Sequence, residues 1–441
     1  MISLGVLLAI SIRFFFDREG IVSYEYIIAK VLFVTLVCQG SLLYNELYSI
    51  NLGDNRRILL IKLLQSLGAT SILLSISYFF WPSLIIGRGI FILTIIVLPP
   101  LLFIWRIFHT KIPVFAQNKE RILIIGTGEL AIEIGKKVID EHHGGYEVVG
   151  YVDENEMRVG ERLFNPKIIA SQEEIIPTVE RERIDRIIVA LPEMRGHLPI
   201  GPLLTLRLDG IGVEDGITFY EKISGKIHVS HLKPGWLIFS EGFRRRQIEI
   251  GKRIVDIFLA VIGLLLTAPV MLMVALLIKL DSTGPVLFRQ ERVGKGGRIF
   301  TLLKFRSMKV DAESRSGPVW AQANDQRITW IGRLMRKLRI DELPQVINVL
   351  KGEMSFVGPR PERSYFVTKL EEKIPYYSLR HTVKPGITGW AQIKYPYGAS
   401  VRDSLEKLQY DIYYIKNMTL LFDLTIVLET IKTVILGKGA R

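Results

Sequence analysis

The sequence predicts three parts: a membrane α-helical bundle of four spans, an α/β Rossmann-like domain, and a mostly α-helical domain with a re-entrant membrane helix. Hydrophobic residues make up 49% of the chain and its mean hydropathy is +0.28, although 23% of its residues are charged. Apolar residues must therefore gather in some stretches and be scarce in others. The length of 441 residues is enough for two or three folded units.

The net charge and the cysteine content restrict the class of protein. The formal net charge of +13 suits nucleic acid, anionic lipid or phosphorylated substrates, and by itself does not choose among them. Cys38 is the only cysteine. An intrachain disulfide and a cysteine-based metal site are therefore excluded.

Residues 1–110 carry four apolar runs, at roughly 2–16, 26–47, 59–81 and 90–107. The last three approach the ~20 residues that cross a bilayer, and the first is shorter. Lysines and arginines gather between the second and third runs and after the fourth, which places both ends of this region in the cytoplasm. The alternative is a buried four-helix core in a soluble protein.

Residues 118–242 show the alternation of strands and helices that predicts a parallel α/β sheet. Strands are expected at 121–125, 146–152 and 186–191, and a helix that follows the first strand ends near residue 139. This order predicts a Rossmann-like domain.

The loop after the first of these strands carries Gly126, Gly128 and Ala131, a pattern typical of dinucleotide-binding loops whose backbone amides face a phosphate. Asp153 lies 27 residues after Gly126, beyond the usual ~20 for an acid that binds ribose. We therefore favour a degenerate domain in which the glycines only permit a tight turn. A nucleotide-binding loop is the alternative.

Residues 250–441 begin with an apolar segment, 254–280, that is long enough to cross a bilayer. Pro269 removes a helix hydrogen bond and predicts a kink. Basic residues flank both ends, so a re-entrant helix over 252–281 is favoured over a spanning one. Near the C-terminus, residues 419–436 have helical apolar spacing and lie either on the membrane surface or against the core.

Most of the positive excess lies in residues 289–339, which contain 13 lysines and arginines and four acids. Lys304, Arg306 and Arg327 occur there among glycines and small polar residues. Such a mixture can bind phosphates as well as anionic lipid head groups.

Two adjacent acids, Asp341 and Glu342, follow this basic stretch. Asp341 is in position to cap a helix that tolerates Pro344 in its first turn and ends at Gly352. Capping does not explain Glu342. Adjacent acids on a helix point in different directions, so one would serve as nucleophile or metal ligand and the other in support. The helix N-terminus and the nearby Arg336 and Arg339 are expected to keep Asp341 ionised.

Two loops stiffened by prolines and glycines come next, at 355–362 and 384–392. Arg360 and Lys384 can meet phosphate from them. Trp390 either belongs to the core or lines a pocket.

Five short motifs follow one another in order through this last part. They are 284–290 (GPVLFRQ), 304–308 (KFRSM), 341–345 (DELPQ), 357–361 (VGPRP) and 385–392 (PGITGWAQ). On these motifs, residues 251–438 resemble the bacterial sugar transferase family of polyprenyl-phosphate hexose-1-phosphate transferases, the monotopic phosphoglycosyl transferases. The first 250 residues resemble the large members, with four spans and a Rossmann-like domain.

The resemblance implies that residues 250–441 are a catalytic domain in which Asp341 is the nucleophile. Asp341 would attack the sugar-bearing phosphate of a UDP-sugar, expel UMP and leave an aspartyl-phosphosugar, which undecaprenyl phosphate then accepts. Glu342 supports Asp341, and Mg²⁺ bound by Asp341 bridges the carboxylate and the diphosphate. The membrane helix breaks at Ala268 and Pro269, where many members have Ser in place of Ala268.

Further expectations follow from the same resemblance. Substrate phosphate or nucleotide is expected to meet Lys304, Arg306, Arg327, Arg333, Arg339, Arg360, Lys384 and Gln392. The partners are UDP-sugar, undecaprenyl phosphate and the lipid bilayer, without nucleic acid, and a homodimer is left open. The protein is expected to be multi-pass in the bacterial inner membrane with a cytoplasmic catalytic domain, at the first membrane step of exopolysaccharide, capsule or O-antigen synthesis. The hexose is not indicated.

Two alternative functions stay open. A membrane-anchored, NAD-dependent sugar-nucleotide epimerase or dehydratase needs a Tyr-x-x-x-Lys pair. Tyr365 and Lys369 have that spacing but lie far from Gly126, so we take the pair as chance. The other is a non-enzymatic membrane scaffold or nucleotide sensor.

Overall fold

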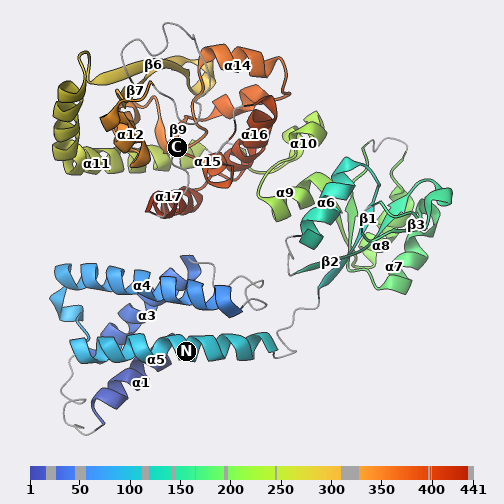
Figure 1. Cartoon of the computed structure of the whole chain (residues 1–441). Helices are drawn as coiled ribbons and strands as arrows, with labels where there is room; N and C mark the ends of the chain where they lie inside the picture. Colours follow the sequence, from blue (N-terminus) through green and yellow to red (C-terminus); the bar gives the residue numbers. More distant parts are fainter. Residues whose placement is uncertain are drawn as a thin grey trace. The chain divides into compact units, whose positions relative to one another are not determined.

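A computed structural model shows a helical N-terminal part, an α/β region and a C-terminal domain of helices with two small sheets (Figure 1). It describes residues 1–15, 26–44, 56–111, 119–140, 145–163, 165–192, 197–243, 246–308, 327–395, 398 and 400–435. The chain forms two compact units: residues 1–124, 135–187 and 200–212, and residues 125–134, 188–199 and 213–441. This division joins residues 213–242 to the C-terminal domain, whereas the boundaries expected from the sequence keep them apart.

The four predicted apolar runs each contain a helix: α1 (Ile2–Arg13), α3 (Ile27–Tyr44), α4 (Arg56–Phe80) and α5 (Arg88–Lys111). Helix α1 packs against α3 and α5, and α4 also packs against α3 and α5. Gly5 permits the close approach of α1 and α5, since a Cβ there would lie 2.7 Å from a Leu98 methyl group. Their apolar stretches in the described residues are shorter than a full span, so the expected four membrane spans stay a prediction.

The central sheet has five strands in the order β3-β2-β1-β4-β5, and β2 pairs with β3 in parallel. The strands are β1 (Glu120–Ile125), β2 (Tyr146–Asp153), β3 (Ile168–Ser171), β4 (Arg186–Val189) and β5 (Gly212–Asp215). The order matches five of the six strands of a doubly wound nucleotide-binding fold, whose full order is 3-2-1-4-5-6. The three predicted strands are confirmed. Strands β3 and β5, which have only four residues each, were not predicted from the sequence.

The α-helices described between residues 126 and 243 are α6 (Glu129–Asp140), α7 (Ile175–Glu182), α8 (Ile200–Leu208), α9 (Gly216–Ser224) and α10 (Pro234–Phe239). The segment that contains α9 is tied to the C-terminal domain. Glu221 pairs with Lys416 and accepts a hydrogen bond from Asn417, and Lys226 pairs with Glu406.

The C-terminal domain opens with α11 (Arg246–Asp281). Its other elements are β6 (Leu287–Val293), β7 (Ile299–Phe305), α12 (Trp330–Lys337), η7 (Ile340–Glu342), α13 (Gln345–Lys351), β8 (Ser355–Val357), α14 (Ser364–Glu371), η8 (Tyr377–Thr382), β9 (Gly386–Thr388), α15 (Trp390–Lys394), α16 (Val401–Lys416) and α17 (Leu420–Ile435). Strands β6 and β7 pair antiparallel, and β8 and β9 pair in parallel.

Helix α11 is the one described helix that is long and apolar enough to cross a membrane. Figure 1 shows its two halves running in different directions, and Pro269 lies inside it. Ala268 has no hydroxyl group, but the Thr267 hydroxyl donates to the Gly263 carbonyl at 2.7 Å, a bond that favours bending. The helix begins at Arg246, before the start of the expected re-entrant helix over 252–281.

Helix α17 (Leu420–Ile435) covers most of the C-terminal segment 419–436, for which the sequence left open a place on the membrane surface or against the core. Its inner face packs through Phe422 and the fully buried Ile426 onto α16, near Tyr414. Its outer face exposes Leu421 and Leu424. An exposed apolar stripe on an otherwise packed helix is typical of a membrane-surface helix.

Candidate active site

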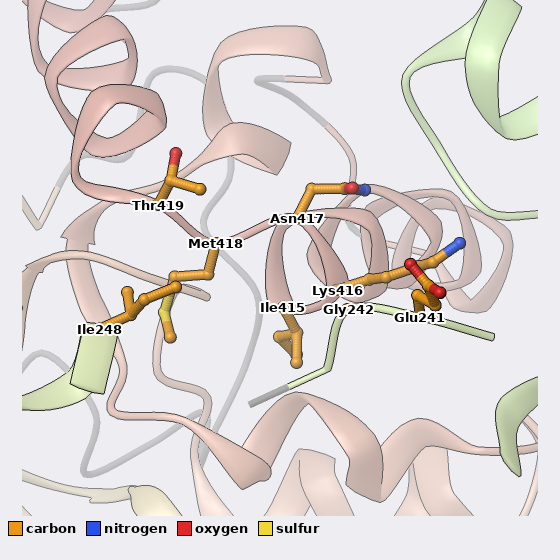
Figure 2. Close-up of a pocket in the computed structure, with 8 residues that line it drawn as sticks. All are labelled: Glu241, Gly242, Ile248, Ile415, Lys416, Asn417, Met418 and Thr419. Atoms are coloured by element: carbon orange, nitrogen blue, oxygen red, sulfur yellow. The ribbon is translucent and has the colours of Figure 1, made fainter. Parts of the chain in front are cut away.

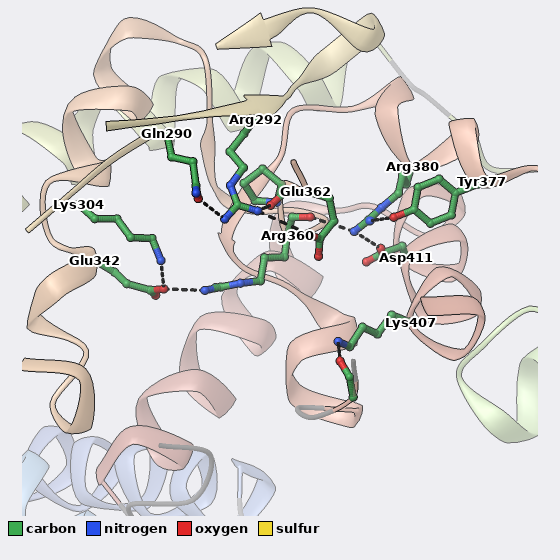
Figure 3. Close-up of polar contacts among 12 residues, drawn as sticks. Gln290, Arg292, Lys304, Glu342, Arg360, Glu362, Tyr377, Arg380, Lys407 and Asp411 are labelled. Carbon is green, nitrogen blue, oxygen red and sulfur yellow. Dashed lines mark hydrogen bonds and ion pairs between the residues drawn. The ribbon is translucent and has the colours of Figure 1, made fainter. Parts of the chain in front are cut away.

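The centre of the candidate site is Glu342, which is held by two cations. The Lys304 ammonium lies 2.9 Å and the Arg360 guanidinium 2.7 Å from the same carboxylate oxygen, Oε1 (Figure 3). The Glu342 side chain is only 12% exposed. Burial alone would raise the pKa of Glu342, but Arg360 and Lys304 more than offset it and hold that pKa below its usual range.

Its neighbour Asp341 is 8% exposed. Among the described residues it has neither a hydrogen bond nor an ion pair. Burial raises the pKa of Asp341, while Lys304 and Arg336 act in the opposite direction. The expectation that Arg336 and Arg339 keep Asp341 ionised stays a prediction, and burial acts against it. The two adjacent carboxylates therefore differ in their surroundings: the pKa of Asp341 is raised and that of Glu342 is lowered.

The local backbone differs from the predicted cap. Asp341 lies in the short turn η7, and α13 begins only at Gln345, with Pro344 at its N-cap position. The helix ends as predicted, at Gly352 with φ of 86°. Arg339, before the turn, has φ of 55°, which is strained for a residue other than glycine. Asp341 therefore does not cap α13.

Lys304 reaches Glu342 because β7 is hydrogen-bonded to a side chain of α13. Asn348 is fully buried; its Oδ1 accepts from the Leu303 amide at 3.0 Å, and its Nδ2 donates to the Thr301 carbonyl at 2.7 Å. These bonds lie on both sides of Leu302 and fix the strand one residue before Lys304. No pattern in the sequence pointed to Asn348, because its two partners on β7 are more than 40 residues away.

Arg360 reaches Glu342 because two glycine-rich loops meet closely. A Cβ on Gly386 would lie 2.1 Å from the Gly358 nitrogen, and one on Gly389 would lie 2.2 Å from the Gly358 oxygen. Glycine is required here for contact between backbones. Trp390 donates to the Gly225 carbonyl at 2.8 Å and packs among aromatic rings, so it belongs to the core.

Other predicted site residues lie elsewhere. Arg306 is buried and donates to the backbone oxygens of Ser282 and Thr283 at 2.8 and 2.9 Å. It therefore anchors the turn after α11. Arg333 is exposed on α12, and Arg327 and Arg339 are half-buried before and after that helix.

Lys384 and Gln392 are also outside the Glu342 cluster. Burial and Arg253 lower the pKa of Lys384. A Cβ at Gly352, at the far end of α13, would lie 3.5 Å from the Lys384 ammonium. Gln392 donates to the Ile387 carbonyl at 3.3 Å, while its buried Oε1 has no partner among the described residues.

A magnesium ion fits the donor set at Asp341. In the described part of the chain no three His, Cys, Asp or Glu side chains form a metal-binding group. Mg²⁺ commonly uses one or two carboxylates and takes its other ligands from substrate phosphates and water. Asp341 offers a buried carboxylate that is not engaged by the described residues, whereas Oε1 of Glu342 is already engaged by two cations.

The glycine loop of the α/β region has an explanation within the protein. Gly126 has φ of 113°, and a Cβ there would lie 2.6 Å from the Ala190 oxygen. Ala131 is fully buried. Asp153 pairs with Arg158 at 2.7 Å. These contacts support the interpretation of a tight turn.

A separate cavity of about 270 Å³ shares no lining residue with the Glu342 cluster (Figure 2). It is lined by Glu241, Gly242, Ile248, Ile415, Lys416, Asn417, Met418 and Thr419. Lys416 already pairs with Glu221.

The comparisons agree with the resemblance. A family model described as bacterial sugar transferase matches residues 247–437, and one described as CoA-binding domain matches 44–206. The UDP-N-acetylgalactosamine-undecaprenyl-phosphate N-acetylgalactosaminephosphotransferase of Aeromonas hydrophila is 48% identical over 224 residues, covering 50% of this chain and 52% of that protein. The chain thus spans about half the length of that relative.

Longer matches are found with two glucose phosphate transferases. The UDP-glucose:undecaprenyl-phosphate glucose-1-phosphate transferase of Xanthomonas campestris pv. campestris is 33% identical over 73% of this chain and 68% of that protein. The undecaprenyl-phosphate glucose phosphotransferase of Komagataeibacter xylinus is 33% identical over 82% of this chain and 68% of that protein. A solved Rex-family repressor matches 26% of this chain and 60% of that chain at 17% identity and a TM-score of 0.21, too low to carry an argument.

Proposed function

The chain belongs to the bacterial sugar transferase family of undecaprenyl-phosphate hexose-1-phosphate transferases, and from this premise we propose that it moves a hexose-1-phosphate from a UDP-sugar to undecaprenyl phosphate. The observation that carries the proposal is the buried Asp341, which has no partner among the described residues, beside Glu342, which has two. The epimerase reading is not favoured. Lys369 donates to the Tyr365 hydroxyl on the exposed face of helix α14.

Asp341 is the proposed nucleophile. Its carboxylate oxygen attacks the phosphorus that bears the sugar, the bond from that phosphorus to the bridging oxygen breaks, and UMP leaves with that oxygen. The phosphate oxygen of undecaprenyl phosphate then attacks the same phosphorus and releases the Asp341 carboxylate. Positioning and charge stabilisation provide most of the rate in such transfers.

The cations around Glu342 provide that positioning. Lys304 and Arg360 fix the Glu342 carboxylate and keep it ionised, and they hold positive charge beside Asp341, where a diphosphate gains negative charge. A bound Mg²⁺, held by Asp341, would supply neutralisation of the diphosphate charge. Arg306 supports the turn after α11 instead of meeting the substrate. The predicted substrate contacts that remain are Arg327, Arg333, Arg339, Lys384 and Gln392.

The proposed setting is the bacterial inner membrane, with α1, α3, α4 and α5 as four spans and α11 as a re-entrant helix. The exposed apolar faces of α11 and α17 and the bend in α11 support this arrangement. A helix that returns to its own leaflet keeps Asp341 and Glu342, hereafter the dyad, in the cytoplasm with the UDP-sugar. The place at the first membrane step of polysaccharide synthesis, and a homodimer, stay predictions.

The test measures both halves of the reaction with the full chain in membranes. A panel of UDP-sugars is incubated with protein and Mg²⁺ in the absence of undecaprenyl phosphate. We expect UMP release of up to one molecule per protein and an intact-protein mass raised by one phosphosugar. Adding undecaprenyl phosphate removes the adduct and allows turnover. No UMP with any UDP-sugar would contradict the proposal.

A further inference from the structure

Arg360 is held from behind by a buried ion pair. Arg380, on η8, donates from Nη2 to the Arg360 carbonyl at 2.9 Å and from Nη1 to the Tyr377 hydroxyl at 2.6 Å (Figure 3). The same Nη2 lies 2.9 Å from Oδ2 of Asp411, on α16. The side chains of Arg380 and Asp411 are 7% and 2% exposed. Both charges are therefore shielded from water.

We propose that Arg380 and Asp411 are positioning residues, which set the place of Arg360 and thereby the orientation of Glu342 beside Asp341. This inference rests on the proposed function. Asp411 orients Arg380, Arg380 holds the Arg360 main chain, and the Arg360 side chain binds Glu342. Neither Arg380 nor Asp411 pairs with the dyad.

The burial of this pair calls for a role beyond stability. Replacing a buried ion pair by apolar side chains is often neutral or even stabilising, because desolvation offsets the attraction. Here one partner also binds the carbonyl of Arg360. The loop that carries Arg360 contains Gly358, at which the neighbouring backbones come into close contact. A single additional hydrogen bond at that carbonyl therefore limits the remaining movement of the loop.

The surroundings of Asp411 give the proposal a pH signature. Burial raises the pKa of Asp411 to about 6, against the attraction of Arg380. The other charged or titratable groups that act on it are Lys407 on its own helix, Glu362 beyond the Arg360 loop and Tyr377 on η8. As pH falls through about 6, Asp411 becomes neutral and its hold on Arg380 weakens.

The sign of the linkage separates this effect from unfolding. The pKa of Asp411 is higher in the fold than its ordinary value of 3.8. The stability contributed by its protonation is therefore fully present below about pH 4 and is lost as pH rises through about 6. Below about pH 6, protonation of Asp411 should therefore stabilise the fold while it lowers activity. A loss of activity there that depends on Asp411 is not caused by unfolding.

The test is Asp411→Asn in the full chain, with kcat and KM for the preferred UDP-sugar measured in the presence of undecaprenyl phosphate at several pH values. We expect kcat to fall about 10²-fold, because small misplacements in a site have effects of that size. The KM should change little, and the fall in kcat below pH 6 should disappear. The matched control is Asp423→Asn, which breaks the buried pair with Lys252 but touches no member of this chain of contacts. It should keep the acid limb of the profile.

A second variant keeps the proposal testable if Asp411→Asn does not fold. Tyr377→Phe removes one hydroxyl group that holds Arg380 and should lower kcat about tenfold. If the variant that folds keeps both the wild-type kcat and the fall in kcat below pH 6, the inference is overturned while the proposed function stands. A wild-type protein that releases no UMP would instead overturn the proposed function.

Discussion

The loop after β1 and the turn that carries the dyad both contain ligand-binding motifs, but their key residues have different partners. After β1, Gly126 faces a neighbouring backbone and Asp153 is paired with Arg158. At the dyad, Glu342 is paired twice while Asp341, equally buried, has no described partner. A buried carboxylate without a partner costs free energy, and this cost supports the proposal that Asp341 meets a ligand. A motif whose residues have partners is explained by the fold.

The largest effect is expected at Asp341. Asp341→Asn keeps the shape and removes the charged nucleophile, so UMP release should fall about 10⁴-fold or more. The measurement is single-turnover UMP release with Mg²⁺ and without undecaprenyl phosphate, together with the mass of the protein. Since Asp341 caps no helix, the thermal midpoint should not fall. If Asp341→Asn released UMP at the wild-type rate, the nucleophile would lie elsewhere and the contrast between the two regions would be lost.

The next effect is expected at Lys304. Lys304→Met keeps the length of the side chain but leaves Glu342 with Arg360 alone, so the pKa of Glu342 should rise toward its usual value. Loss of one preorganised cation should lower kcat about 10²- to 10³-fold. The matched control is Lys369→Met on α14, which breaks an exposed contact with Tyr365. Its kcat should stay near wild type, whereas the epimerase reading requires inactivation.

Much of this contrast was accessible from the sequence because the signals are local. Strand β1, its glycine turn, the adjacent acids and Arg360 each lie within a short motif. Asn348 and Asp411 were missed, since their partners come from segments about 30 to 50 residues away and no local pattern names them. The sequence predicted that Arg306 meets phosphate, whereas it binds backbone carbonyls. A basic side chain near glycines can do either, and only the fold distinguishes the two roles.

A third variant tests the tie between the two motif-bearing regions. The sequence placed residues 118–242 and 250–441 in separate domains, yet Glu221 pairs with Lys416 at a site where both side chains are nearly buried. Glu221→Ala should lower the free energy of unfolding by about 3–5 kcal/mol, because Lys416 is left unpaired. The kcat of the folded protein should not change. Glu161→Ala, which breaks an exposed contact with Arg158, is the control and should lower stability by less than about 1 kcal/mol.

The smallest effects are expected in the loop after β1. Gly126→Ala places a methyl group 2.6 Å from the Ala190 oxygen at a φ of 113°, so it should destabilise the protein by more than about 1 kcal/mol. Gly128→Ala meets only the Pro192 ring at 3.1 Å, which can shift, and should have a smaller effect. Thermal unfolding and UMP release per folded molecule are measured for both. If the loop only permits a turn, the variants differ in stability and agree in activity. Equal losses of activity in both, without a matching loss of stability, would mean that the loop binds a ligand that catalysis needs, and the two regions would then not differ in kind.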